Sequence, residues 1–415
     1  SPKKKAVLLN SPGVGTWLYR PDLKSAGKVK RAMVAPGTRE LHPWGSAQLK
    51  SWEKLPKPDR KAREAELAGL PVNQVFDSKY PGYLKSKTWS TAIIDTDRGV
   101  VIYTGGGHSG YTGNDIALFD VGANRWSMDN PPCFFPYFSN YNASLYGWGY
   151  HLRATSQHTY RWYAYDPVSK LMVYCARYCG PRDGFTVQLF EDEKPFVYDS
   201  KKHKAWTFLY DPVNNVNYPA VFGRPFRNGW SLALCGTPQG VFAKGGGNLY
   251  LAKVTRDDAK KRADVRWELL EGGAPSGAGE FQPLVFDSKR KRLLFVAAKK
   301  GKDVQVWEHP LGKGEWKEIA LSKSTKHISR ELVYDAENDC LVSMPKEKLM
   351  VLHLGAEKKE WKELDLAMPK GRYGTECAMV YDPVHKLCVM LIPKGFSGYM
   401  QTMLFRYDPK TAKYK

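Results

Sequence analysis

The feature that most constrains the fold is an order of strands and turns that recurs six times between Thr88 and Tyr414. Each unit contains an apolar strand, a polar turn with an aspartate or asparagine, further strands and a closing aromatic residue. The closing aromatics follow one another at intervals of roughly 45 to 80 residues, close to the length of a propeller blade. They are Trp126, Trp206, Trp267, Trp316, Trp361 and Tyr414. Because one such unit cannot bury both faces, the repeat predicts sheets packed against one another.

The first unit carries the pattern most clearly, with the double glycine Gly105-Gly106 followed by Tyr111, Asn114 and Trp126. In these residues the chain resembles the kelch and galactose-oxidase-like β-propellers, over 86–415. The resemblance implies an all-β ring of four-stranded antiparallel blades. Such rings serve as scaffolds, lyases, hydrolases, epimerases and oxidases, so the function must be argued from a site.

The number of blades depends on how the N-terminal segment 1–52 is interpreted. It holds several short apolar runs and three tryptophans, which are enough for a degenerate blade. We therefore predict seven blades, with six blades plus an N-terminal extension as the alternative. We interpret 53–85 as a linker with a short exposed helix over 59–70, and 86–415 as six kelch-like blades that include an aromatic-rich insertion at 129–157.

The charge balance points to the class of partner. The chain has 63 Lys+Arg against 42 Asp+Glu, a net charge of +21, and 13% aromatic residues. Cations attract acidic polymers, and aromatic faces stack on bases and sugar rings, although the basic clusters are scattered along the chain as in an ordinary solvated surface. We expect the partner to be an anionic polysaccharide or oligosaccharide, with no nucleic acid, and the protein to be a monomer.

The ends of the chain and its apolar runs indicate where the protein acts. No stretch approaches the roughly 18 apolar residues of a membrane span, so we expect no membrane insertion. The sequence starts at Ser1 without an initiator methionine. We expect that a signal peptide has been removed and that the protein is secreted or periplasmic.

The blade topology predicts which segments meet at a site. In an up-and-down blade, the loop after the second strand and the segment that leads into the inner strand emerge on the same face. On that face we place the loop with His108, Ser109, Tyr111 and Asn114. The segments 157–161, 327–331 and 372–376 and the insertion 130–156 lie there as well.

The insertion carries eight Phe, Tyr or Trp residues in 27 positions, a density that an ordinary connection does not need. Tyr146, Trp148, His151 and Arg153 are its predicted sugar contacts. The alternative is a self-packed loop that caps the central channel, and both interpretations are compatible.

Two histidines give the sharpest hypothesis. Three glycines precede His108 in GGGHSGYTGND, and glycines allow a loop to approach a ligand closely. His158 opens the inner strand of the next blade and is expected to lie beside it. For each histidine, a hydrogen bond to a neighbouring blade is the structural alternative.

These residue types resemble those of the propeller-fold polysaccharide lyases, which cut uronate-containing polymers by β-elimination. That reaction needs a cation to neutralise the carboxylate, a base for the C5 proton and an acid for the leaving oxygen. We assign His108 or His158 as the base, Tyr160 or Tyr111 as the acid, and Arg330 or Arg372 as the carboxylate partner. The predicted substrate-binding residues are Asn114, His151, Arg153, Tyr146, Trp148, Tyr373, Glu331 and Glu376.

Other functions remain as alternatives. A non-catalytic glycan- or protein-binding kelch propeller needs only a groove of rings and cations. A glycoside hydrolase would use Glu331 and Glu376, for which ion pairs with nearby arginines are the structural explanation. A copper-radical oxidase is the weakest alternative, because only the adjacent Tyr150-His151 matches part of its ligand set.

Metal and cofactor signals are weak. The chain lacks the phosphate-loop, HExxH, GxSxG and dinucleotide-binding motifs, so we expect no cofactor and no catalytic metal, and leave a structural calcium open. The turn aspartates are expected to bond to the backbone instead. Seven cysteines without paired spacing predict buried strand residues, with one bridge between Cys175 and Cys179 as the alternative.

Overall fold

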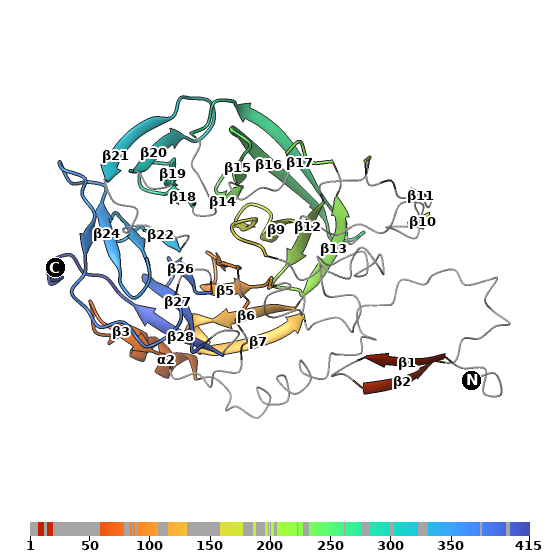
Figure 1. The fold of residues 1–415 in the computed structure, drawn as a ribbon, viewed down its shortest axis with the longest axis horizontal. Helices are drawn as coiled ribbons and strands as arrows, with labels where there is room; N and C mark the ends of the chain where they lie inside the picture. Colours follow the sequence, from red (N-terminus) through yellow and green to blue (C-terminus); the bar gives the residue numbers. More distant parts are fainter. Residues whose placement is uncertain are drawn as a thin grey trace.

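The computed structural model describes residues 7–11, 15–19, 59–78, 84, 86–87, 89–106, 115–130, 158–176, 186–187, 196–197, 199, 201–202, 206–221, 223–226, 232–260, 262–275, 282–298, 303–322, 331–373, 376–395 and 399–415. In this part of the chain, six four-stranded antiparallel sheets surround a common axis (Figure 1). Neighbouring sheets meet through their inner strands, so the protein is a six-bladed β-propeller.

The first three blades follow chain order, with one interruption. The first contains β4 (Ala92–Asp95), β5 (Val100–Tyr103), β6 (Ile116–Asp120) and β7 (Arg125–Asn130), and the second β8 (Tyr163–Asp166), β9 (Leu171–Cys175), β12 (Thr207–Asp211) and β13 (Val216–Val221). The small sheet of β10 (Thr186–Val187) and β11 (Phe196–Val197) is inserted within the second blade. The third contains β14 (Ala233–Thr237), β15 (Gly240–Gly245), β16 (Asn248–Asp257) and β17 (Arg262–Glu271).

The remaining blades repeat this order until the last strand. The fourth contains β18 (Leu284–Asp287), β19 (Arg292–Ala298), β20 (Val304–Pro310) and β21 (Lys317–Ser322), and the fifth β22 (Leu332–Asp335), β23 (Cys340–Ser343), β24 (Met350–His353) and β25 (Lys362–Glu363). The sixth contains β26 (Ala378–Asp382), β27 (Leu387–Pro393) and β28 (Met400–Phe405), and its outer strand is β3 (Val75–Asp77).

The strand β3 closes the ring. It precedes the first blade in sequence, yet it pairs antiparallel with β28, with Phe76 opposite Leu404. The segment after β28, which the repeat assigned to the outer edge of this blade, instead pairs with the fifth blade through a bridge from Tyr414 to Leu364. The sixth blade therefore combines three strands from the C-terminal part of the chain with one strand that precedes the first blade.

The prediction of seven blades is wrong, and the alternative count of six is correct. In the N-terminal segment, the structure describes β1 (Val7–Ser11) and β2 (Gly15–Tyr19), which form a two-stranded sheet of their own and add no blade. The ring has no room for a seventh blade, because β3 completes the sixth blade and β26 of that blade already lies against β4 of the first.

The predicted role of the turn aspartates is confirmed. In the turn between β4 and β5, the carboxylate of Asp95 accepts a hydrogen bond from the backbone N–H of Asp97 at 3.1 Å. The same bond to a backbone N–H two or three residues later recurs at Asp166, Asp199, Asp211, Asp287, Asp335, Asp382 and Asp408. These carboxylates thus stabilise tight turns.

The helix predicted over 59–70 is present as α2 (Arg60–Ala68). The Asp59 side chain caps it by accepting from the N–H of Ala62, and Leu67 is buried. The buried Arg63 donates to the carbonyl oxygen of Val121 in η1 (Val121–Ala123). The helix therefore packs on the first blade, and among the described segments no helix is long and apolar enough to cross a membrane.

The apolar core lies between the blades. Successive clusters join each pair of neighbouring sheets, and most strands are buried on both faces. Four of the cysteines occupy such positions, as the sequence predicted: Cys175, Cys340, Cys377 and Cys388 are buried. Cys179 lies outside the described residues.

Candidate functional site at the channel mouth

A fully buried carboxylate ties four blades together at the axis. Glu331 directly precedes the inner strand of the fifth blade and is 0% exposed. Its Oε2 accepts from Thr91 Oγ1 of the first blade and from the backbone N–H of Met379 of the sixth, both at 2.9 Å. Nη2 of Arg161, in the second blade, lies 4.0 Å away. The propeller axis is thus crossed by charged and polar groups.

The same network continues through backbone carbonyl oxygens. Arg161 Nη2 also donates to the carbonyl oxygen of Leu332 at 3.2 Å, and Tyr163 donates its hydroxyl to the carbonyl oxygen of Thr91. Contact between Glu331 and a substrate, as predicted, would require this network to open. We therefore place the ligand surface above it, at the end of the channel where the inner strands begin.

A histidine and a tyrosine from the predicted catalytic set lie in contact at this end. His158 Nδ1 is 3.2 Å from Tyr160 Oη, and Trp89 stacks on the imidazole with ring centroids 5.4 Å apart. The backbone of Tyr160 has φ +44°, a left-handed conformation that is strained for an aromatic residue. Its N–H donates to the carbonyl oxygen of Trp89 at 2.9 Å, which fixes this conformation.

The glycine loop of the first blade begins beside this pair. A Cβ on Gly105, which has φ +106°, would lie 2.2 Å from Ser90 Oγ and 2.7 Å from Thr159 Cγ2. The N–H of Gly106 donates to the same serine oxygen at 2.9 Å. Glycine is therefore needed for the first blade to pass this close to the second, whereas the predicted approach of His108 to a ligand lies outside the described residues.

Eight of the predicted site residues lie outside the described residues, and their roles stay predictions. They are His108, Tyr111, Asn114, Tyr146, Trp148, His151, Arg153 and Arg330.

A basic pocket opens beside the sixth blade. Its volume is about 570 Å³, and it is lined by Lys370, Gly371, Arg372, Lys394, Gly395 and Gln401. The N–H of Arg372 donates to the carbonyl oxygen of Pro393 at 2.8 Å, which holds the segment against the loop between β27 and β28. A Cβ on Gly371 would lie 2.4 Å from the side chain of Ile392, so only glycine allows this approach. Three cations around one hollow are suited to an anion.

Glu376 anchors the arginine of this pocket. Its Oε1 lies 2.9 Å from Arg372 Nε, while its Oε2 is buried and has no hydrogen-bond partner among the described residues. Burial raises the pKa of Glu376, and Arg372 opposes this effect. Glu376 lies three residues before Met379, whose N–H bonds to Glu331 near the start of the inner strands. Tyr160 also precedes an inner strand, so the basic pocket lies at the same end of the channel as Tyr160. The adjacent Tyr373 donates its hydroxyl to the carbonyl oxygen of Pro369 at 2.5 Å.

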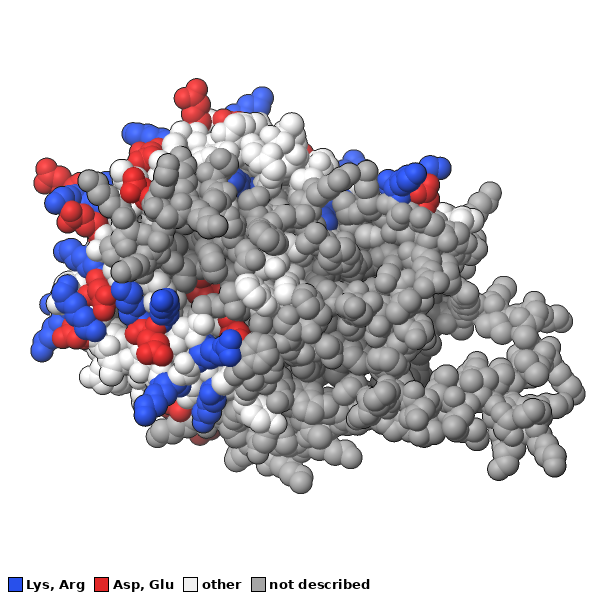
Figure 2. Space-filling model, viewed as in Figure 1, with Lys and Arg blue, Asp and Glu red and all other residues white. Residues whose placement is uncertain are grey.

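Elsewhere the described charges are mixed in sign. Figure 2 shows lysines and arginines next to aspartates and glutamates around the rim of this view, as expected for a solvated surface. Among the described residues, no group of three His, Cys, Asp or Glu side chains is arranged to hold a metal ion. The basic pocket is therefore a more specific feature than the net charge.

The sequence argument missed Lys370, Lys394 and Gln401 of the basic pocket. The available signal was the pair of PKG motifs at 369–371 and 393–395, which place a lysine and a glycine on each side of the hollow. It also missed Trp307, a tryptophan outside the series of closing aromatics. This residue lines a separate groove at the rim.

Comparisons with known proteins give no family for this chain. No protein-family model matches the sequence, and no curated protein matches it significantly. Solved structures resemble it at 10% identity, among them a chain of the mitotic checkpoint complex, with a TM-score of 0.43 and coverage of 86% of this chain and 98% of that one.

Two Bacteroides proteins resemble it to a similar degree. A candidate 6-phosphogluconolactonase from Bacteroides uniformis has a TM-score of 0.40, 10% identity and coverage of 79% and 88%. A protein of unknown function from Bacteroides thetaiotaomicron has a TM-score of 0.42, 10% identity and coverage of 81% and 73%. These likenesses carry no argument about activity, and the propeller assignment rests on the strand order described above.

Proposed function

We propose that this kelch-type propeller acts on an anionic, uronate-containing polysaccharide at the channel mouth and cleaves it by β-elimination. The observation that carries the proposal is the 3.2 Å contact between His158 Nδ1 and Tyr160 Oη, held by a strained backbone at the start of an inner strand. An imidazole and a phenol within hydrogen-bond distance form a proton-transfer pair. A secreted location suits such a substrate.

The pair accounts for both proton movements of the reaction. His158 takes the C5 proton through Nε2, a buried atom that a substrate reaches only when the groups covering it move aside. The electrons of the C5–H bond form the C4=C5 double bond, and the C4–O bond breaks. Tyr160 gives its hydroxyl proton to the leaving oxygen. A proton then passes from Nδ1 of the imidazolium to the phenolate across the 3.2 Å contact, which restores the phenol and leaves a neutral imidazole protonated at Nε2. Exchange with water then returns the imidazole to the form protonated at Nδ1 before the next turnover.

The uronate carboxylate needs a cation, because its negative charge opposes removal of the C5 proton. Arg372 is our choice, with Lys370 and Lys394 in the same pocket. The ion pair with Glu376 holds the arginine through Nε. The arginine side chain remains 50% exposed and accessible to a ligand.

The test is absorbance near 230 nm during incubation with a panel of uronate polysaccharides, since the 4,5-unsaturated product absorbs there. We expect a rising signal that is lost in His158→Ala and Tyr160→Phe. The matched control is His353→Ala, which removes a second histidine–tyrosine pair, His353 Nε2 to Tyr407 Oη at 2.8 Å. That pair lies near the turn between β22 and β23, at the opposite end of the fifth blade. Activity that survives both mouth variants would refute the assignment.

A non-catalytic glycan-binding propeller is the second candidate. It is favoured by the ion pairs of the two described arginines at the mouth, since Arg161 lies near Glu331 and Arg372 pairs with Glu376. Paired arginines neutralise a substrate carboxylate less effectively than unpaired ones. A flat absorbance trace together with salt-sensitive binding of the same polymers would support this candidate instead.

A further inference from the structure

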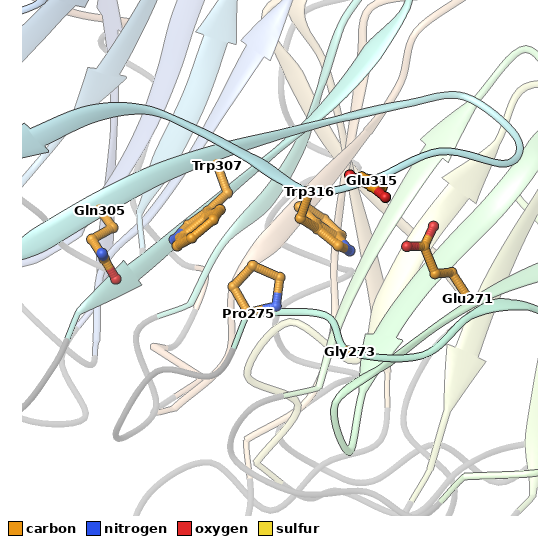
Figure 3. A pocket seen from close by; sticks show the side chains of 7 residues that line it. All are labelled: Glu271, Gly273, Pro275, Gln305, Trp307, Glu315 and Trp316. Atoms are coloured by element: carbon orange, nitrogen blue, oxygen red, sulfur yellow. The ribbon is translucent and has the colours of Figure 1, made fainter.

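A groove at the rim, between the third and fourth blades, is built differently from the channel mouth. It has a volume of about 620 Å³ and is lined by Glu271, Gly273, Pro275, Gln305, Trp307, Glu315 and Trp316. In Figure 3, the two indoles stand on either side of Pro275, with Gln305 at one end and both glutamates at the other. All of these residues belong to third and fourth strands or to the loops that flank them, not to inner strands.

Trp307 is exceptional at its position in the repeat. It lies beside Leu284 and Phe295 across β18, β19 and β20, and it is only partly buried. The residues at the corresponding third-strand position of the other blades are Ala117, Phe208, Tyr250, Met350 and Met403, and all of them are buried. The fourth blade therefore presents to the groove an aromatic side chain at a position that the other blades bury in their core.

The groove offers both donors and acceptors. The indole nitrogens of Trp307 and Trp316 are buried and have no hydrogen-bond partner among the described residues, so a ligand reaches them only when the atoms that cover them move aside. Glu271 accepts from His309 Nε2 at 2.8 Å through one oxygen, and Glu315 is exposed with no ion pair within the described ranges. The amide of Gln305 supplies a donor and an acceptor. Among the described residues that line the groove there is no lysine or arginine.

The walls of the groove are held in place by neighbouring groups. Trp316 packs against Phe295 and the buried His309, with ring centroids 5.9 and 4.8 Å away. The opposite wall turns at Gly273, which has φ +75°, and the N–H of Ala274 next to it donates to the carbonyl oxygen of Gly247 at 2.8 Å. The two walls are therefore fixed before a ligand arrives, which reduces the entropic cost of binding.

We propose that this groove binds a neutral hexopyranose unit, at a site separate from the channel mouth. The apolar face of the sugar ring stacks on Trp307, its hydroxyl oxygens accept from the indole N–H groups, and its hydroxyl groups donate to the two glutamates. The proposal does not depend on the proposed lyase reaction, because the two sites share no residue.

The lining excludes the other ligand classes. An anionic sugar would meet two carboxylates, with no cation among the described lining residues to offset them. An ammonium group would satisfy the carboxylates but could not accept from the indole N–H groups. A purely apolar ligand would desolvate the carboxylates without replacing their hydrogen bonds.

The test uses saturation-transfer NMR and tryptophan fluorescence with methyl glucoside, methyl galactoside, methyl mannoside, glucuronate and glucosamine. We expect millimolar binding of at least one neutral glycoside, weakened about fivefold in Trp307→Phe and in Glu315→Ala, since each loses one hydrogen bond. The matched control is Trp361→Phe, because the indole nitrogen of Trp361 also lacks a partner among the described residues but lies in the fifth blade, away from the groove.

Two outcomes would overturn the inference. One is that no neutral glycoside binds the wild-type protein, or that glucuronate or glucosamine binds more tightly. The other is that binding survives Trp307→Phe in a protein whose near-UV circular dichroism is otherwise native. His158→Ala separates the two proposals, because it should abolish lyase activity and leave glycoside binding unchanged.

Discussion

Lys244 gives a sharp test of the electrostatic reasoning. This lysine lies on β15 and is 1% exposed, and no described acidic side chain forms an ion pair with it. Its ammonium group lies 4.1 Å from the centroid of the Phe295 ring, in the core between the third and fourth blades. Burial lowers the pKa of Lys244 from 10.5 to about 8. We predict that Lys244→Met stabilises the protein at neutral pH.

The magnitude follows from the two pKa values. Their difference corresponds to about 3 kcal/mol of lost stability at a pH below both, since one pKa unit is about 1.4 kcal/mol. A cation–π contact with Phe295 returns about 0.5 to 2 kcal/mol. We therefore expect Lys244→Met to raise the free energy of unfolding by about 1 to 3 kcal/mol at pH 7.

The pH dependence identifies the cause. Between about pH 8 and 10.5 the unfolded chain binds the Lys244 proton and the folded chain does not, so the stability of the wild-type protein rises with pH in that window. The advantage of Lys244→Met should be complete below pH 8 and should disappear above 10.5. Urea denaturation of both proteins at a series of pH values measures this difference. A methionine variant that is less stable, or an advantage that does not change with pH, would refute the reasoning.

Lys87 is the matched control, because it is also buried but has a partner. Its Nζ lies 2.7 Å from Asp115 Oδ2, and both side chains are 0% exposed. Lys87→Met leaves the Asp115 carboxylate buried without its cation, which costs about 3 to 5 kcal/mol. The same substitution should thus have opposite signs at Lys87 and Lys244.

Three further predictions concern the ring. Glu331→Ala should lower the free energy of unfolding by about 3 to 5 kcal/mol, because Arg161 loses its buried partner. If urea denaturation shows a loss below about 1 kcal/mol, the proposed network is wrong. A chain lacking residues 1–58 should give the circular dichroism and elution volume of a folded propeller, whereas one lacking 1–78, and with it β3, should aggregate; equal behaviour would disprove the closure. Gly105→Ala should lower the melting temperature by several degrees, since its Cβ would clash with a neighbouring blade, and an unchanged melting temperature would rule out the close approach.

The repeat indicated six blades, the N-terminal segment led to the wrong prediction of a seventh, and β3 explains why. Only three residues, Val75–Asp77, complete the sixth blade, and their pairing with β28 joins segments far apart in sequence. A strand this short carries no measurable periodicity, so it cannot be distinguished from a linker by its pattern. The tryptophans of the N-terminal segment suggested a seventh blade because composition does not report whether a ring is already closed.

The candidate site was predictable where it depends on topology and unpredictable where it depends on pairing across the axis. The repeat correctly placed His158 and Tyr160 before an inner strand, but the sequence argument did not predict their contact. The partner of Arg161 could not be found in this way, because Glu331 lies three blades further along the chain. The blade repeat fixes which end of the channel a residue occupies, whereas the twist and closure of the whole ring decide which residues meet there. Glu331 illustrates the consequence: its position resembles that of a catalytic carboxylate, but its burial and two hydrogen bonds at 2.9 Å make it a structural link between blades.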